Sequence, residues 1–388
     1  MQRLTTLDQS YQVAQLRQLL DFLDTRTTAM ADGIYRNPVT DYTCRDQLAT
    51  ERDALFRRHP LVMGLGNDIP NPGDFLTDDF SGVPLLVVRG EDGGARGFLN
   101  VCRHRGSKVA EGRGNRKRFV CPYHAWTYGT DGKLLRIPHD SGFPGVDRAC
   151  HGLIPVPVVE KYGLLWAMAS PGGEFDVDEV LEGAERDLAS YDLGRYCLYE
   201  TRVLEQKMNW KLVIDTFLET YHVRVLHPAT LDPILHSNVG TFETFGRNNR
   251  SIYVRRTIDE LRELPESDWD LVHHTAIVYV LFPNTVFIMQ QDHLEIWRIY
   301  PVGDDPDRAR MYVHLYTPEP ALTESAKGHW NRNMDLLMSI VLEEDFPNGE
   351  NIQRSFYSGA QEHVTYGRNE PALGHYHESI KRHLARAA

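Results

Sequence analysis

The chain has 388 residues, of which 41% are hydrophobic and 10% aromatic, so it can form two ordinary domains with buried cores. Its formal net charge of −12 argues against nucleic acid as a partner. The sequence has no apolar run of about 18 residues, which a membrane-spanning helix needs, and no apolar leader at its N-terminus. Its five scattered cysteines do not make a disulfide framework, and these features together predict a cytoplasmic protein.

Residues 1–54 are predicted to be an N-terminal helical segment that packs on the larger C-terminal domain. Within 7–23, leucines recur at the spacing of an amphipathic helix. The stretch that follows is rich in Pro, Gly and Asp, which predicts loops with short helices.

Residues 55–170 are predicted to form a small all-β domain. Short apolar segments flank Glu91-Asp92-Gly93-Gly94 and again flank Asp131-Gly132, which is the pattern of β-hairpins. Residues 162–168 supply a closing strand, and Pro171-Gly172-Gly173 marks the end of the domain.

Two short loops of this domain carry paired cysteine and histidine residues, Cys102-Arg103-His104 and Cys121-Pro122-Tyr123-His124. Two kinds of metal centre use two thiolates and two imidazoles: a structural zinc site and a Rieske [2Fe–2S] cluster, in which two Cys bind one iron and two His bind the other. One His in each loop is the Rieske order, whereas zinc ribbons more often place Cys-x-x-Cys in one loop and both His in another. The spacing therefore favours the cluster over zinc.

Basic side chains surround these loops, and they have two interpretations. They form either an ordinary solvated surface or a docking surface for an acidic electron donor. The chain has no strand followed by G-x-G-x-x-G, so flavin or nicotinamide chemistry belongs to a partner. The basic residues are Arg103, Arg105, Lys108, Arg113, Arg116, Lys117 and Arg118.

A second group of metal-ligating residues lies between Asn209 and Pro228. The apolar pattern predicts a buried helix, on which Asp215, Glu219 and His222 share one face at i, i+4 and i+7. His227 lies about 140° round the helix from His222, so both can reach one ion only if the helix breaks between them. The residue before a proline is pushed out of helical space, which frees His227 to do so. Two His with a distant carboxylate predict a 2-His-1-carboxylate iron site.

The rest of residues 171–388 is predicted to be an antiparallel sheet covered by a long C-terminal helix. Near its middle this helix carries Glu343-Glu344-Asp345, and one of these three acids is the candidate third ligand. The last thirty-odd residues predict a peripheral helix. Its histidines, His375, His377 and His383, are given no role.

With these motifs in place, the chain resembles the catalytic α subunit of the Rieske non-haem iron oxygenases, which are the ring-hydroxylating dioxygenases and their monooxygenase and demethylase relatives. The resemblance implies an α+β fold, with a Rieske domain followed by a helix-grip domain in which an antiparallel sheet wraps around a long helix. It implies a cluster held by Cys102, His104, Cys121 and His124, and an Fe(II) held by His222, His227 and Asp345, with Asp345 chosen over Glu344.

The resemblance also implies roles for two further acids. Glu219 stands where the family has an acid that links the first iron His to a cluster His of the next subunit of a trimer, and it resembles the trimethylamine-type oxygenases in being Glu. Asp215 stands where many members have Asn near the iron. Electrons would come from an NAD(P)H-dependent reductase, directly or through a ferredoxin, and pass from His124 of one subunit through Glu219 to His222 of the next.

The implied reaction is hydroxylation or dihydroxylation of a small aromatic or related compound with O₂. The alternative is hydroxylation or demethylation of a quaternary ammonium or methoxy compound. An aromatic-lined pocket suits a flat ring, and it also suits a quaternary ammonium through cation–π contact. The residues expected to face the iron are Phe217, Leu218, Val225, Tyr279, Phe287, Met289, Gln291 and His293.

Overall fold

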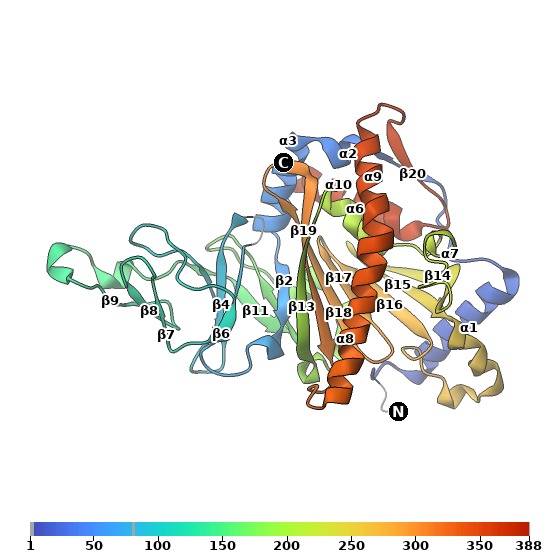
Figure 1. Cartoon of the computed structure of the whole chain (residues 1–388), viewed down its shortest axis with the longest axis horizontal. Coiled ribbons are helices and arrows are strands. Elements are labelled where there is room, and N and C mark those ends of the chain that lie inside the picture. Colours follow the sequence, from blue (N-terminus) through green and yellow to red (C-terminus); the bar gives the residue numbers. More distant parts are fainter. Residues whose placement is uncertain (1–3, 80–81, 388) are drawn as a thin grey trace. The chain divides into compact units, whose positions relative to one another are not determined.

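The computed structural model describes residues 4–79 and 82–387 and divides them into two compact units. The first, here called the cluster unit, is Glu51–Val180; the second, the catalytic unit, combines residues 4–50 with 181–387 (Figure 1). The α+β fold class is confirmed. Among the residues described, none of the helices has the length and hydropathy needed to cross a membrane.

The cluster unit is built from short antiparallel strands, as the hairpin patterns predict. One sheet has the order β10-β5-β4-β3-β6, a second β11-β12-β2, and a third β7-β8-β9. The turn of the β8–β9 hairpin needs Gly132, whose φ is +78°, a conformation that favours glycine. The strands are β2 Leu61–Leu65, β3 Asp74–Asp78, β4 Leu85–Arg89, β5 Ala95–Leu99, β6 Arg113–Asn115, β7 Arg118–Val120, β8 Thr127–Gly129, β9 Leu134–Arg136, β10 Pro155–Val156, β11 Val158–Lys161 and β12 Leu164–Ala167.

The catalytic unit is organised on one antiparallel sheet of order β13-β19-β18-β17-β16-β15-β14. Successive side chains of a strand point to opposite faces of the sheet, and the pair Val278–Ile288 fixes the register of its central strands. Every residue of β16 is buried, because helices cover the sheet. The strands are β13 Cys197–Gln206, β14 Leu235–Phe245, β15 Asn248–Arg255, β16 Thr275–Leu281, β17 Thr285–Met289, β18 Leu294–Val302 and β19 Asp305–Thr317.

A long helix crosses one face of this sheet (Figure 1), as the sequence predicts. It consists of α8 (Glu324–Ser339), a π-helical turn (Ile340–Asp345) and α9 (Phe346–Phe356). Pro347 has no backbone N–H to give to the preceding turn, so the hydrogen-bond register changes there. Such π-turns are frequent at functional sites, and this one ends on Asp345.

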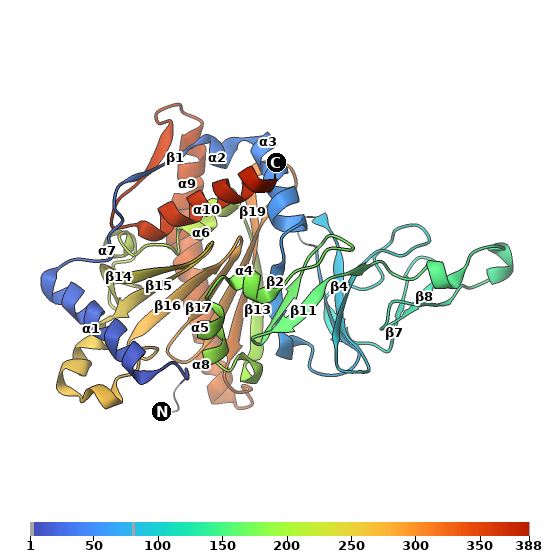
Figure 2. The ribbon, with the colours of Figure 1, turned by 180° about the vertical axis from the view of Figure 1, so that it is seen from behind.

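Further helices and a two-stranded sheet complete the catalytic unit (Figure 2). Asp8 caps α1 by accepting hydrogen bonds from the backbone N–H groups of Ser10 and Tyr11. The two-stranded sheet pairs β1 (Tyr35–Pro38) with β20 (His363–Tyr366). The helices are α1 Gln9–Thr25, α2 Thr40–Thr43, α3 Arg45–Glu51, α5 Glu185–Ser190, α6 Trp210–Asp215, α7 Val223–Leu226 and α10 Pro371–Ala387, whereas α4 Val177–Leu181 lies almost entirely in the cluster unit.

The prediction of one continuous helix from Trp210 onward is wrong. α6 ends at Asp215 and α7 begins only at Val223, so Glu219 and His222 do not share a helical face with Asp215. The cause is local: the Glu219 carboxylate accepts hydrogen bonds from the backbone N–H groups of Tyr221 and His222, which would otherwise continue the helix.

A buried ion pair joins α5 to the sheet. Arg250 of β15 and Asp187 of α5 form a salt bridge, and both side chains are almost completely buried. Tyr279 also donates to Asp187, at 3.0 Å. A buried charge that loses its partner is strongly destabilising.

We therefore expect Asp187→Asn to lower the free energy of unfolding of the catalytic unit by about 3–5 kcal/mol, because the buried Arg250 keeps only Glu243, whose side chain is half exposed, as a counter-charge. Urea unfolding followed by circular dichroism measures this. The matched control is Glu266→Gln, which breaks the exposed pair with Arg17 and should cost less than about 1 kcal/mol. Equal effects of the two substitutions would contradict the importance of burial.

Candidate metal centres

The two Cys-His loops of the cluster unit have the same backbone turn. The N–H of Gly106 donates to the carbonyl of Cys102 at 3.0 Å, and the N–H of Ala125 donates to the carbonyl of Cys121 at 3.0 Å. Gly106 and Ala125 both have positive φ, +82° and +57°. Each turn folds the chain back after its histidine, so two donors come from each loop.

The four side chains fit a Rieske cluster. The thiols of Cys102 and Cys121 are buried, and the Tyr128 hydroxyl lies 3.2 Å from the Cys102 sulfur. The imidazoles of His104 and His124 have centroids 4.6 Å apart. Their Nδ1 atoms are buried and have no hydrogen-bond partner among the described residues, and a metal ion is the kind of partner that such paired nitrogens take.

The surface beside the second loop is basic and aromatic. Arg105 lies over the ring of Tyr123, 4.3 Å from its centroid, and Tyr123 in turn contacts His124 with centroids 3.8 Å apart. Lys108 and Arg113 are engaged in ion pairs with Asp79 and Asp68. The other exposed residues of the basic stretch are Arg116, Lys117 and Arg118.

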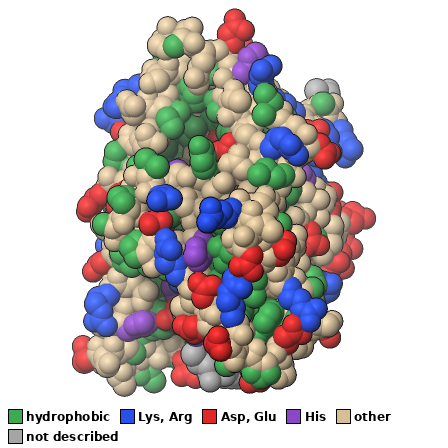
Figure 3. All heavy atoms as spheres, turned by 90° about the vertical axis from the view of Figure 1, so that its right-hand side faces the viewer, with side chains coloured by type: hydrophobic (Ala, Val, Ile, Leu, Met, Phe, Trp, Pro, Cys, Tyr) green, Lys and Arg blue, Asp and Glu red, His purple; other side chains and the backbone are tan. Residues whose placement is uncertain are grey.

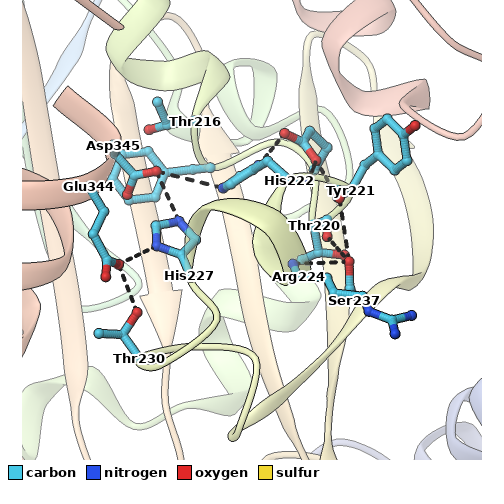
Figure 4. Close-up of polar contacts among 12 residues, drawn as sticks. Thr216, Thr220, Tyr221, His222, Arg224, His227, Thr230, Ser237, Glu344 and Asp345 are labelled. Carbon is cyan, nitrogen blue, oxygen red and sulfur yellow. Dashed lines mark hydrogen bonds and ion pairs between the residues drawn. The ribbon is translucent and has the colours of Figure 1, made fainter. Parts of the chain in front are cut away.

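In the catalytic unit, His222 and His227, at the two ends of α7, converge with Asp345 of the long helix (Figure 4). One ligand atom from each lies within 4.8 Å of the others. The Nε2 atom of His227 is 3.1 Å from Oδ1 of Asp345, and Nε2 of His222 is 3.7 Å from the same oxygen. His227 is fully buried, and two imidazoles with one carboxylate are the donor set of a mononuclear iron.

Each imidazole of this site is oriented by a second carboxylate. The Nδ1 atom of His222 pairs with Glu219, and Nδ1 of His227 lies 2.5 Å from Oε2 of Glu344. Thr230 donates to the same Glu344 oxygen at 2.7 Å. Such outer partners fix the tautomer of a metal-binding histidine so that Nε2 points at the metal. The contacts therefore favour Asp345 as the ligand and Glu344 as the outer partner.

These contacts set the protonation of the site in the absence of metal. Burial lowers the pKa of His227, but its hydrogen bonds to Asp345 and Glu344 outweigh burial and raise the pKa above the ordinary value. Burial likewise opposes ionisation of Glu344, yet the hydrogen bonds from His227 and Thr230 lower its pKa. A bound metal cation would take the place of the proton on His227.

The convergent site lies between two cavities that share Thr216, Glu219, His222 and Asp345. The first cavity, of about 130 Å³, is mostly apolar, and we call it the substrate cavity. The second, of about 190 Å³, has a similarly apolar lining that also carries four carboxylates, and we call it the acidic cavity. A larger cavity of about 610 Å³ is lined by none of the converging residues and mainly by charged or polar side chains, so we do not assign the reaction to it.

Most residues expected to line the substrate cavity do not. Phe217 lines it, but Tyr279, Phe287 and Met289 lie on the opposite face of the sheet, because Ala276, Val278 and Ile288 take the cavity-facing positions of the same strands. Val225 is 85% exposed. The remaining residues that do not appear in the lining are Leu218, Gln291 and His293.

The C-terminal helix is also not peripheral, and His377 was missed. His377 is buried, and its Nε2 atom lies 2.8 Å from Oδ1 of Asp215. Asp215 borders the acidic cavity, and its hydrogen bonds go to Tyr42, Tyr366 and His377 rather than to the three converging residues. The only sequence signal for His377 was a polar residue on the apolar face of an amphipathic helix.

Comparison with known proteins agrees with both centres. Residues 193–386 match the ring hydroxylating alpha subunit (catalytic domain) family, and residues 59–157 match the Rieske [2Fe-2S] domain. The chain belongs to the Rieske oxygenase α subunits. It is thus a Rieske-type non-haem iron oxygenase with a [2Fe–2S] cluster and a mononuclear iron, and the zinc alternative is excluded.

Among curated relatives, the carnitine monooxygenase oxygenase subunit of Acinetobacter pittii is 26% identical over 85% of this chain and 87% of that protein. The glycine betaine monooxygenase oxygenase subunit of Chromohalobacter salexigens is 35% identical over 52% of this chain and 45% of that protein. The putrescine 2-hydroxylase of Ralstonia nicotianae is 29% identical over 73% of this chain and 76% of that protein.

Solved structures show the same fold. A quaternary ammonium Rieske monooxygenase in complex with L-carnitine superposes with a TM-score of 0.77 at 21% identity, over 91% of this chain and 96% of that chain. Naphthalene 1,2-dioxygenase with indole bound superposes with a TM-score of 0.70 at 18% identity, over 90% of this chain and 92% of that chain.

The geometry predicts different effects for the neighbouring acids of the long helix. We expect Asp345→Ala to abolish iron retention by the catalytic unit, and Glu344→Ala to weaken iron binding about 10–100-fold, as loss of an outer partner does. Iron analysis after dialysis against a chelator measures both. Glu343→Ala, on the exposed position beside them, is the matched control and should retain iron. Iron retention in Asp345→Ala would refute the ligand assignment.

Proposed function

We propose that this oxygenase subunit is a monooxygenase that hydroxylates or demethylates a small cationic nitrogen compound. His222, His227 and Asp345 would hold the iron, which when bound supplies O₂ activation, and Cys102, His104, Cys121 and His124 would hold the cluster, whose electrons feed it. The relatives named for carnitine, glycine betaine and putrescine support this substrate class, since each of these compounds carries a positively charged nitrogen. These relatives favour a quaternary ammonium or other cationic nitrogen compound over an aromatic substrate.

The lining of the substrate cavity is the observation that carries this proposal. Glu219, Glu295 and Asp345 line it, and none of the described residues that line it is Lys or Arg. Phe217 and Tyr253 add aromatic faces, which attract a cation. A cavity of about 130 Å³ suits a compound of few heavy atoms.

Of the three acids in this cavity, Glu219 is hydrogen-bonded to the proposed ligand His222 and Asp345 is itself a proposed ligand. Glu295 has neither role. Burial opposes its ionisation, but its hydrogen bonds, above all that from His293, lower its pKa. Burial would also lower the pKa of His293, yet the bonds to Asp292 and Glu295 raise it to about 9, so this imidazole is protonated at neutral pH. His293 does not line the cavity, so the negative end of the Glu295–His293 pair faces the substrate.

A panel of substrates with O₂ uptake and product mass tests the class. Because none of the described residues that line the cavity is a Lys or Arg that could pair with a carboxylate, we expect compounds whose only charge is positive, such as putrescine or choline, to have a higher kcat/KM than zwitterions such as carnitine. Glu295→Gln should lower kcat/KM for the cations about 10–100-fold, which is the loss of one hydrogen bond or contact to a charged group. Turnover of neutral aromatic compounds alone would overturn the proposal.

A neutral analogue of the preferred cation is the control for Glu295→Gln, since its kcat/KM should not change. Removal of Glu295 alone leaves the buried His293 with Asp292 but without its second acidic partner, which can harm folding. The double variant His293→Gln/Glu295→Gln removes both charges. This double variant should show the same loss of kcat/KM for the cation as Glu295→Gln. If the wild-type enzyme has equal kcat/KM values for the cation and its neutral analogue, Glu295 does not have the proposed role.

We further propose a trimer in which electrons cross between subunits. Glu219 would carry them from His124 of one subunit to His222 of the next. Two observations support a subunit contact here: Tyr221 is 61% and Val225 85% exposed beside this loop, and apolar side chains that are exposed together mark contact surfaces. Figure 3 shows the face on which α7 lies, where apolar side chains reach the surface between charges of both signs.

The electron donor is proposed to be an NAD(P)H-dependent reductase, acting directly or through a ferredoxin. The exposed Arg105, Arg116, Lys117 and Arg118 support a docking surface on the cluster unit. Lys108 and Arg113 are already paired with acids of this unit, so their contribution to docking is smaller.

For Glu219→Gln we expect both irons to be retained and product formation to fall strongly, because an amide keeps the size of the side chain but not its charge. Metal analysis, single-turnover reduction of the cluster and product yield separate these effects. Normal product yield in this variant would remove Glu219 from the electron path.

Mixed oligomers test the crossing directly. Asp345→Ala subunits lack the proposed iron site and His124→Ala subunits lack the proposed cluster, so each alone should be inactive. Co-assembled, they should recover part of the activity, since some interfaces then pair an intact cluster with an intact iron site. No recovery from verified mixed oligomers would mean that electrons stay within one subunit.

A further inference from the structure

Oxygenation with O₂ consumes protons, and the proposed iron site where they are needed is largely buried. Monooxygenation converts a C–H bond, O₂, two electrons and two protons into C–OH and water. The electrons come from the reductase through the cluster, so the protons need a separate source. The acidic cavity borders the proposed ligands His222 and Asp345, and its size of about 190 Å³ admits several water molecules.

Asp215 forms one wall of this cavity and is held from behind by three donors. His377 Nε2 lies 2.8 Å from Oδ1 of Asp215, and the hydroxyls of Tyr42 and Tyr366 lie 2.8 Å and 3.2 Å from Oδ2. The three donors also contact one another: the Tyr42 oxygen is 2.5 Å from that of Tyr366 and 2.9 Å from Nε2 of His377. Four polar groups from four elements therefore share protons in one closed network.

The network is buried on every side except the cavity. The Tyr42 and His377 side chains are almost completely inaccessible, and Asp215 retains only 11% of its side-chain surface. Burial raises the pKa of both tyrosines above the ordinary value, so they stay protonated and act as fixed donors. The other two groups of the network, the Asp215 carboxylate and the His377 imidazole, are an acid and a base joined by one hydrogen bond.

The other charged groups near the network are few and mostly acidic. Glu219, Glu370 and Asp345 share the acidic cavity with Asp215, and none of the described residues that line it is Lys or Arg. The ammonium of Lys211 lies 5.9 Å from the ring centroid of Tyr42, and Lys211 does not line the acidic cavity. The carboxylates of the cavity therefore favour a positive charge beside it.

We infer that Asp215 and His377 form a proton store for the iron centre, which delivers through the acidic cavity. In turnover, the His377 imidazolium would pass its Nε2 proton to Oδ1 of Asp215, and Asp215 would pass a proton to water in the cavity. His377 is left neutral and Asp215 is again a carboxylate, so one of the two protons is supplied. The pair recharges from cavity water after product leaves. Tyr42 and Tyr366 are positioning residues, since they orient the carboxylate without losing a proton.

The first test uses the metal-free protein without substrate. The Nε2 proton of His377 should give a downfield ¹H resonance, assigned by its loss in His377→Gln. We expect it to exchange rapidly with solvent despite burial, and Asp215→Asn to slow the exchange about 10²-fold, the low end of what a positioned acid–base group contributes. If the hydrogen bond is purely structural, the Nε2 proton of His377 would exchange slowly in both the wild type and Asp215→Asn. That result would overturn the inference.

The second test uses the loaded enzyme. Asp215→Asn and His377→Gln should retain both metals and normal cluster reduction, while product formation falls, hydrogen peroxide release rises and the solvent isotope effect increases. Glu370→Gln is the matched variant: it removes an acid of the same cavity that accepts a bond from the backbone of Gly367 and lies outside the network. A larger effect of Glu370→Gln than of Asp215→Asn would assign the protons to Glu370 and overturn the inference.

The inference rests on the oxygenase activity and not on the proposed substrate class. If no cationic compound is turned over, the proposed function fails while the exchange measurement still stands. If exchange of the His377 proton is slow while a cationic substrate is turned over, the store fails and the proposed function stands. The two failures are therefore distinguishable.

Discussion

The catalytic unit depends on the orientation of two imidazoles. His222 and His227 each give Nδ1 to a carboxylate, Glu219 or Glu344, and this leaves both Nε2 atoms directed at Asp345. A free imidazole can present either nitrogen, so without these acids the three donors would not form one site. The broken helix before His222 and the π-turn before Asp345 are the backbone consequences of this requirement.

The same arrangement divides the surroundings of the iron site into two compartments. On one side, apolar strand residues and Glu295 form a cavity that suits a small cation. On the other, carboxylates and the Asp215 network form a cavity that suits water and protons. Thr216, Glu219, His222 and Asp345 border both cavities. A site between two such cavities can receive substrate and protons from different sides.

Sequence reasoning succeeded where the determinants are local. The Cys-His loops are short and each carries its own turn, so the spacing alone predicted which side chains meet. The hairpins, the long C-terminal helix and the His222–His227 pair were predicted for the same reason. It failed where a side chain replaces helical hydrogen bonds of the backbone, as the Glu219 carboxylate does. It also failed for Tyr279 and Phe287, because a shift of one residue along a strand decides which face of the sheet a side chain occupies.

By itself, the sequence determined the class of protein, because the identities and spacing of metal-ligating residues within a loop do not depend on the rest of the fold. It also narrowed the third ligand to three adjacent acids. Only the tertiary structure showed that Asp345 and not Glu344 lies beside both Nε2 atoms, which strand residues line the substrate cavity, and that His377 lies beside Asp215. The contacts of His227 with the two acids and of His377 with Asp215 join segments more than a hundred residues apart, and they are set by the packing of helices on the sheet, which local spacing does not encode.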